Sequence, residues 1–187
     1  MKRLMVIALA VCLAPLARAQ DKEENPFKKA KVGDWVEYKM TTMAGGFNIE
    51  AKTKMEVTAK DDKEVTVKTT ASVGGMEGKS QEMKIDLTKP YDPTQAGNLP
   101  KDAEAKIEKA GDGKEKIKVG GKDYDTTWQK MKVKAKAMGL EIESEVTVWR
   151  AKDVPLDGTV KMTGVSKVMG MDVKMTMELV DSGSKKD

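Results

Sequence analysis

The methionines are the residues of this chain with the most distinctive chemistry. The sequence contains 14 methionines, a single cysteine (Cys12) and no histidine. This composition excludes a Ser-His-Asp triad, an imidazole base and a Cys/His zinc site. Thioether sulfurs are soft ligands that bind Cu(I). Met162, Met175 and Met177 fall on one face of a predicted hairpin and are therefore a candidate Cu(I) site.

The alternative is that methionine serves as a flexible hydrophobic residue on the apolar face of a sheet. Strict alternation of apolar and polar residues favours this interpretation, under which no metal and no cofactor is assigned. Small residues share the face, and together with methionine they suit a cavity for an acyl chain or similar ligand; a tightly curled sheet without a cavity is the other possibility. The small residues are Ala51, Thr53, Ala71, Ala135, Ala137, Ser144, Gly164 and Ser166. The candidate ligand-binding residues are Met40, Met55, Met131, Met162, Met175 and Met177.

No pattern of residues singles out a catalytic centre. The sequence contains no G-x-S-x-G motif, no P-loop and no G-x-G-x-x-G motif. Acidic pairs such as Asp61-Asp62 lack the spacing of a calcium loop, and aspartates in loops mostly serve turns. We therefore expect a protein that is not an enzyme, with no catalytic residues.

The segment from Trp128 to Trp149 shows the clearest strand pattern. Apolar residues alternate with lysines before Met138-Gly139 and with glutamates after it. A two-residue turn there predicts the pairs Lys136–Glu141, Lys134–Glu143 and Lys132–Glu145 on one face, and Ala135–Ile142 and Met131–Val146 on the other. A slip of one residue would break both sets, so the register is strongly specified. Trp128 falls opposite Trp149 on the charged face, as a structural contact or as a candidate interaction patch.

Two further hairpins follow the same design. A turn at Gly45-Gly46 joins strands that begin near Val36 and end near Val57, and a turn at Met169-Gly170 places Met162 opposite Met177 and Gly164 opposite Met175. Residues 102–110 fit either a short helix or a strand. Alternation favours the strand, which a turn at residues 111–113 would lead into a second strand over residues 114–119.

These patterns predict an all-β fold, a curled antiparallel meander of about eight to ten strands with at most one short helix. Nearly every strand has one apolar face, which the sheet must cover by curling into a half-barrel or barrel, or by binding a ligand or partner. We expect one domain at residues 33–181, a flexible leader at 20–32 and a polar tail at 182–187.

The N-terminal 19 residues have the features of a secretory signal peptide. A basic start and an apolar stretch from Leu4 to Leu16 precede an A-x-A cleavage site at residues 17–19, which predicts export to the periplasm or beyond. A competing interpretation is a lipobox ending at Cys12, which would then be lipidated. Removing three basic residues with the signal lowers the net charge from +4 to +1. We therefore expect no nucleic-acid partner, and no other segment could span a bilayer.

Two stretches carry a resemblance to a known group of proteins. They are Gly33-Asp34-Trp35-Val36-Glu37-Tyr38 and the segment from Val148 to Lys161, which contains Val154-Pro155 and Asp157-Gly158-Thr159-Val160-Lys161. They resemble small exported bacterial β-proteins of unknown function, whose layout is similar to that of periplasmic lipoprotein carriers. The resemblance implies a curved half-barrel and a lipid or other apolar ligand. A structural or protein-interaction component of the cell envelope is the alternative.

Overall fold

The protein is almost entirely built of antiparallel strands. The computed structural model describes residues 25–89, 104–137, 140–168 and 170–185. The one helix among them is the 3-10 turn η1 (Pro26–Lys29). The strands are β1 (Asp34–Ala44), β2 (Phe47–Lys60), β3 (Glu64–Val73), β4 (Met76–Glu77), β5 (Gln81–Asp86), β6 (Glu104–Val119), β7 (Lys122–Ala137), β8 (Leu140–Arg150), β9 (Thr159–Val168) and β10 (Met171–Ser184).

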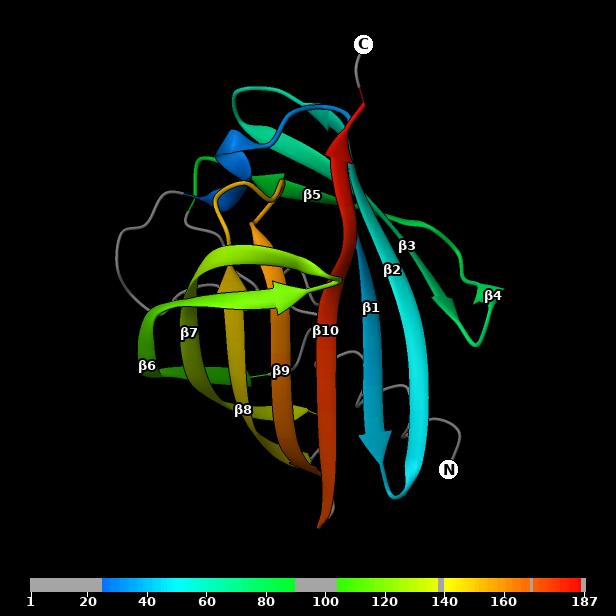
Figure 1. The fold of residues 1–187 in the computed structure, drawn as a ribbon, viewed down its shortest axis with the longest axis vertical. Coiled ribbons are helices and arrows are strands. Elements are labelled where there is room, and N and C mark those ends of the chain that lie inside the picture. The colour runs from blue at the N-terminus through cyan, green and yellow to red at the C-terminus, as the bar shows by residue number, and fades with distance from the viewer. Residues whose placement is uncertain (1–24, 90–103, 138–139, 169, 186–187) are drawn as a thin grey trace.

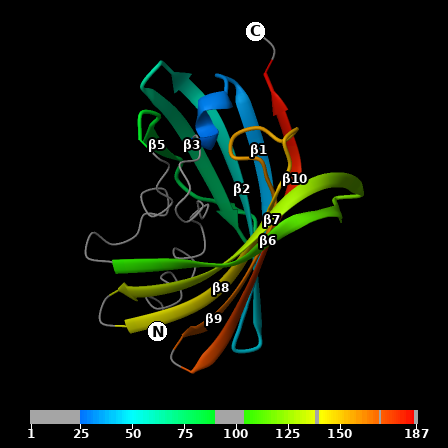
Figure 2. The same cartoon turned by 90° about the vertical axis from the view of Figure 1, so that its left-hand side faces the viewer.

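The ten strands form one curled sheet (Figure 1). Their order is β4-β3-β2-β1-β10-β9-β8-β7-β6, and β5 pairs with β3 beyond the end of β4. Figure 2 shows the sheet bent around a concave side, with β6 and β3 on opposite flanks and no pairing that closes the ring. The predicted all-β meander is therefore confirmed, and of the two predicted shapes the sheet adopts the half-barrel.

The predicted register of the hairpins is confirmed. Lys134 lies opposite Glu143 and Met131 opposite Val146 in β7–β8, while Met162 lies opposite Met177 in β9–β10. One ion pair differs from the prediction, because Glu145 binds Lys130 at 2.6 Å although its direct partner in the ladder is Lys132. Diagonal neighbours on the same face of a sheet are within reach of a long side chain. The predicted turn residues Met138, Gly139 and Met169 lie outside the described residues.

Strand β6 corrects the predicted turn at residues 111–113. The segment is a strand rather than a helix, as alternation favoured, but it runs unbroken to Val119. The ladder with β7 shifts register between Lys109 and Gly111, which marks a bulge. Since β7 supplies a partner along this whole length, the glycines of β6 bend the strand instead of reversing it.

Both ends of the described chain are more ordered than predicted. In the expected leader, Phe27 of η1 is fully buried and its backbone N–H donates to Asn25 Oδ1 at 3.1 Å. In the expected polar tail, Ser182 to Ser184 continue β10 and pair with Asp34 to Val36 of β1. Backbone pairing to a neighbouring strand holds this polar segment, which its side chains alone did not indicate.

One face of the sheet, which we call the inner face, forms the core. In β1 it carries Val36, Tyr38 and Met40, all of them buried, while Lys39 on the opposite, outer face is exposed. The hydroxyl of Tyr38 donates to the carbonyl oxygen of Thr159 at 3.1 Å. This bond links β1 to the start of β9 across the intervening β10. Burial raises the pKa of Tyr38 well above its ordinary value of 10.0, and the Asp157 carboxylate adds to the rise while Arg150 opposes it.

Replacing Tyr38 with Phe tests this link. The substitution removes one hydrogen bond and leaves the Thr159 carbonyl unpaired, so we expect the free energy of unfolding to fall by about 1 kcal/mol at pH 7. Above pH 10 the unfolded chain ionises Tyr38 while the folded chain does not, so the wild type loses stability there. The difference between wild type and variant should therefore shrink as the pH rises through 10, in urea titrations at several pH values. A difference that does not change with pH would contradict the buried, neutral phenol.

Candidate ligand-binding face

Three methionines lie side by side across the middle of the inner face. Met40 of β1 is opposite Met177 of β10, and Met177 is opposite Met162 of β9. Their side chains are 2%, 8% and 1% exposed, respectively. Three neighbouring strands thus place three thioethers in one continuous, buried row.

A second row shows how small residues and methionine fit together. It runs from Met175 through Gly164 and Val146 to Met131. A Cβ atom added to Gly164 would lie 3.6 Å from the Met175 ε-methyl and 3.8 Å from a Val146 methyl. The Met175 side chain therefore extends over the glycine, and it fills space that the missing side chain leaves open.

The structure brings all six predicted methionines to the inner face. Met55, opposite Val36 and Thr69, is half-buried. The other five are buried, and Met131 is fully inaccessible. The inner face is therefore a core in the structure, not an open surface.

Polar groups on the inner face are few, and two of them have no hydrogen-bond partner. Ser144 and Ser166 bind each other, with their hydroxyl oxygens 2.7 Å apart. Gln129 Oε1 and Thr53 Oγ1 are buried without a partner among the described residues. Gln129 lies at the end of the row that contains Met162. It is opposite Val148, and Val148 is opposite Met162. The sequence prediction missed Gln129, although its two-residue separation from Met131 places it on the same face.

The outer face is a charged, solvated surface. Cross-strand ion pairs such as Lys161–Glu178 (2.7 Å) and Lys39–Glu50 (2.8 Å) lie on it. Exposed pairs of this kind stabilise a protein by well under about 1 kcal/mol each. The charge ladders thus fix the register and the orientation of the sheet more than its stability.

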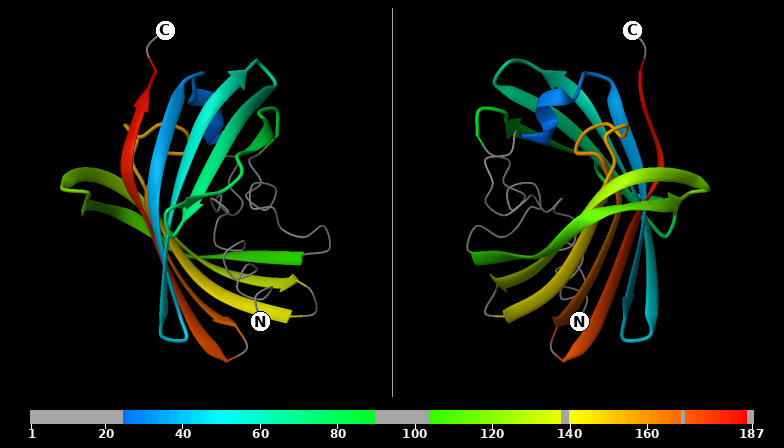
Figure 3. Two further views of the ribbon diagram at one scale, coloured as in Figure 1. Left: turned by 90° about the vertical axis from the view of Figure 1, so that its right-hand side faces the viewer. Right: turned by 60° about the vertical axis from the view of Figure 1, so that its left-hand side comes forward.

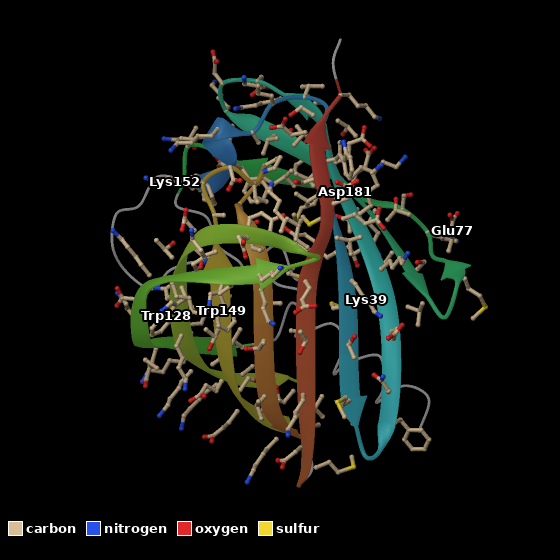
Figure 4. The ribbon with its side chains drawn as sticks, viewed as in Figure 1. Lys39, Glu77, Trp128, Trp149, Lys152 and Asp181 are labelled. Carbon is tan, nitrogen blue, oxygen red and sulfur yellow. The ribbon has the colours of Figure 1, made fainter. Side chains whose placement is uncertain are left out.

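Trp128 and Trp149 lie next to each other on this outer face, as predicted (Figure 4). A Cβ atom added to Gly113 would lie 2.8 Å from Trp128 Nε1, so the indole ring covers this glycine of β6. The indole N–H of Trp149 donates to Glu115 Oε1 at 3.1 Å. Both rings are half-buried. These contacts give the pair a structural role in joining β6, β7 and β8.

A groove of about 1420 Å³ lies at the other end of the strands from the hairpin turn Gly45-Gly46. It is lined by the η1 segment, by residues 114–116 of β6 and 123–127 of β7, and by the β8–β9 loop, where Figure 4 labels Lys152. Its walls carry both lysines and aspartates, and none of the six candidate methionines lines it. The groove is therefore separate from the methionine rows, although core residues such as Tyr124 and Leu156 line it.

The methionines remain the candidate metal ligands. Within the described part of the chain, no three His, Cys, Asp or Glu side chains gather where they could hold an ion. Met162 and Met177 are direct cross-strand neighbours, and Met175 lies one inner-face step from Met177. A Cu(I) site at these three methionines stays a prediction. The described helices include none long and apolar enough to cross a membrane.

Comparison with known proteins identifies structures of similar fold. No family model matches the sequence, and no curated protein matches it significantly. A protein from Bacteroides fragilis, provisionally described as exported and as having a YmcC-like fold, is similar with a TM-score of 0.54 and 12% identity, over 83% of this chain and 97% of that one. A protein from Parabacteroides distasonis, provisionally described as a lipoprotein, is similar with a TM-score of 0.51 and 8% identity, over 82% and 96%. The predicted resemblance to small exported β-proteins is confirmed at the level of the fold.

Replacing Gln129 with Met tests whether its amide oxygen is unpaired in the folded protein. An unpaired buried acceptor destabilises the fold by about 1–3 kcal/mol. We therefore expect Q129M to unfold at the same or higher urea concentration than the wild type. The matched variant Q129E, which buries a charge at the same place, should be clearly less stable. A loss of more than about 1 kcal/mol in Q129M would show that the amide has a partner.

Proposed function

We propose that this chain is an exported, non-enzymatic protein that binds an apolar ligand, such as a lipid, at its Met-rich inner face. The observation that carries the proposal is the pair of buried rows in which methionines adjoin Gly164 and other small residues. Among the described residues, η1 is the one helix available to fill the concave side of the sheet. The predicted signal peptide supports export, and the two similar structures are provisionally described as an exported protein and a lipoprotein.

Methionine suits a face that must be packed without ligand and must also admit one. Its unbranched side chain has three rotatable bonds and adapts to irregular apolar shapes. In this protein the Met175 methyl lies over Gly164 and could swing away without moving the backbone. An acyl chain that replaced such methyls would gain about 0.8 kcal/mol for each buried CH₂ group. Because the five methionines are buried, binding requires this rearrangement of side chains.

Gln129 indicates the polar part of the ligand. Its Oε1 is a hydrogen-bond acceptor, buried and without a partner at the end of the methionine row. A ligand with a hydroxyl or amide N–H at that point would satisfy this acceptor. Binding rather than catalysis is supported by the two inner-face serines, since the hydroxyl groups of Ser144 and Ser166 bind each other. A serine nucleophile needs an adjacent base, and the chain has no histidine to provide one.

A variant that fills the inner face tests the proposal. Gly164→Val adds an isopropyl group beside Met175, where a Cβ atom makes only ordinary contacts. We expect affinity for a fluorescent fatty-acid probe to fall about tenfold, equivalent to about 1.4 kcal/mol, because the added methyls occupy the ligand's space. Urea unfolding of the same variant shows whether the fold is retained.

Val165→Thr is the matched control, because Val165 is the next residue along β9 and lies exposed on the outer face. It should bind the probe as the wild type does. A wild-type protein that takes up no probe and releases no lipid on solvent extraction would contradict the proposed function. Equal loss of affinity in both variants would place the binding elsewhere.

A further inference from the structure

Exposed apolar side chains gather at three hairpin turns. Of the eight large hydrophobic residues exposed among the described residues, five flank these turns. They are Met43 (55% exposed) and Phe47 (69%) at the β1–β2 turn, Val73 (40%) and Met76 (77%) at the β3–β4 turn, and Met171 (51%) at the β9–β10 turn. We call these five residues the apolar rim.

The three turns lie at the same end of the strands. Because every pairing is antiparallel, β1–β2, β3–β4 and β9–β10 reverse direction on one side of the sheet. The β1–β2 and β9–β10 turns are the lowest parts of the described molecule in Figure 3 and touch each other, since a Cβ atom on Gly45 would lie 3.9 Å from Met171 Sδ. The β3–β4 turn is set back along the flank, because Val73 lies opposite Ala51.

The opposite end of the sheet has a polar turn. Its β2–β3 turn reads Lys60-Asp61-Asp62-Lys63, and Asp61 Oδ1 accepts hydrogen bonds from the backbone N–H groups of Lys63 and Glu64. The mixed-charge groove also lies there. Ordinary exposed turns favour polar residues of this kind. Methionine and phenylalanine next to Gly-Gly turns therefore call for a different explanation.

Part of the apolar rim is continuous with the inner face, whereas Met43 lies on the outer face opposite Lys174. Phe47 is on the same side of β2 as Ile49 and Ala51, and Ala51 lies opposite Met40. Met171 is on the same side of β10 as Val173 and Met175. An apolar molecule could pass from the rim to the methionine rows along apolar side chains alone.

Positive charge surrounds the rim. Within six residues of the three turns the chain carries more lysines than acidic residues, and the excess is three: Lys39, Lys52, Lys68, Lys79, Lys167 and Lys174 against Glu50, Glu77 and Asp172. Apolar side chains that enter the lipid interface, with lysines beside them at the headgroups, are typical of proteins that bind anionic membranes reversibly.

We propose that the apolar rim docks on an anionic lipid surface and so directs this end of the inner face toward the bilayer. Its place as the entry for a ligand rests on the proposed function, whereas docking itself does not. The rim suits a fluid lipid surface better than a protein partner, because its side chains project from three hairpin turns, one of them set back from the other two. A protein interface would require one continuous complementary patch.

Flotation with lipid vesicles tests the docking. The triple variant Phe47→Ser, Met76→Ser, Met171→Ser should bind vesicles of phosphatidylcholine with 30% phosphatidylglycerol at least tenfold more weakly than the wild type (roughly 1.4 kcal/mol). Val32→Ser, Val180→Ser is the matched control, since these residues are 53% and 50% exposed and lie away from the rim. It should bind as the wild type does. Pure phosphatidylcholine vesicles and high salt should weaken the binding of the wild type.

Three results would overturn the docking proposal: no vesicle binding by the wild type, equal binding by the triple variant, or a concentration-dependent dimer that the triple variant abolishes. Uptake of the fatty-acid probe in the absence of vesicles separates this proposal from the proposed function. If the triple variant still takes up the fatty-acid probe but no longer binds vesicles, both proposals stand. If the wild type binds vesicles but no probe, the inner-face proposal fails and the docking stands.

Discussion

The need to shield one apolar face of a single sheet is the constraint on which this structure depends. Nearly every strand alternates between apolar and charged residues, so the sheet has a face that water must not reach. Among the described residues only one turn of 3-10 helix accompanies the sheet. The sheet curls as a half-barrel, and its inner residues are buried. The proposed ligand site lies within this buried face.

Methionine and glycine make the curled face adaptable. Rigid β-branched residues define one end of the core, as Val57, Val65 and Val67 do on β2 and β3. The middle of the face instead has flexible thioethers beside Gly164, Ser144 and Ser166, where one side chain can move into the space left by another. Gln129 places one unpaired acceptor within this adaptable region. The alternation that places apolar residues on the inner face continues to the apolar rim. The core is therefore connected to one end of the molecule.

Much of this architecture could be predicted from the sequence, because period-two alternation and the charge ladders fix both faces and register together. The opposition of Trp128 to Trp149 and of Met162 to Met177 followed from two assumed turns. The bulge at Gly111 could not be predicted, since glycine permits a turn or a bulge and the choice depends on the partner strand. The pairing of Ser182–Ser184 and the burial of Phe27 likewise depend on tertiary contacts. Gln129 was missed because a polar residue interrupts the pattern at the end of its row.

The central claim is that an apolar ligand enters among the buried methionines. NMR of protein labelled with ¹³C at the methionine ε-methyl groups tests it most directly, because each methyl reports its own surroundings. On titration with a fatty acid in the absence of vesicles, the signals of Met40, Met131, Met162, Met175 and Met177 should shift and saturate together, while those of the exposed Met43 and Met76 stay in place. Shifts confined to the exposed methionines, with the buried set unchanged, would contradict the account.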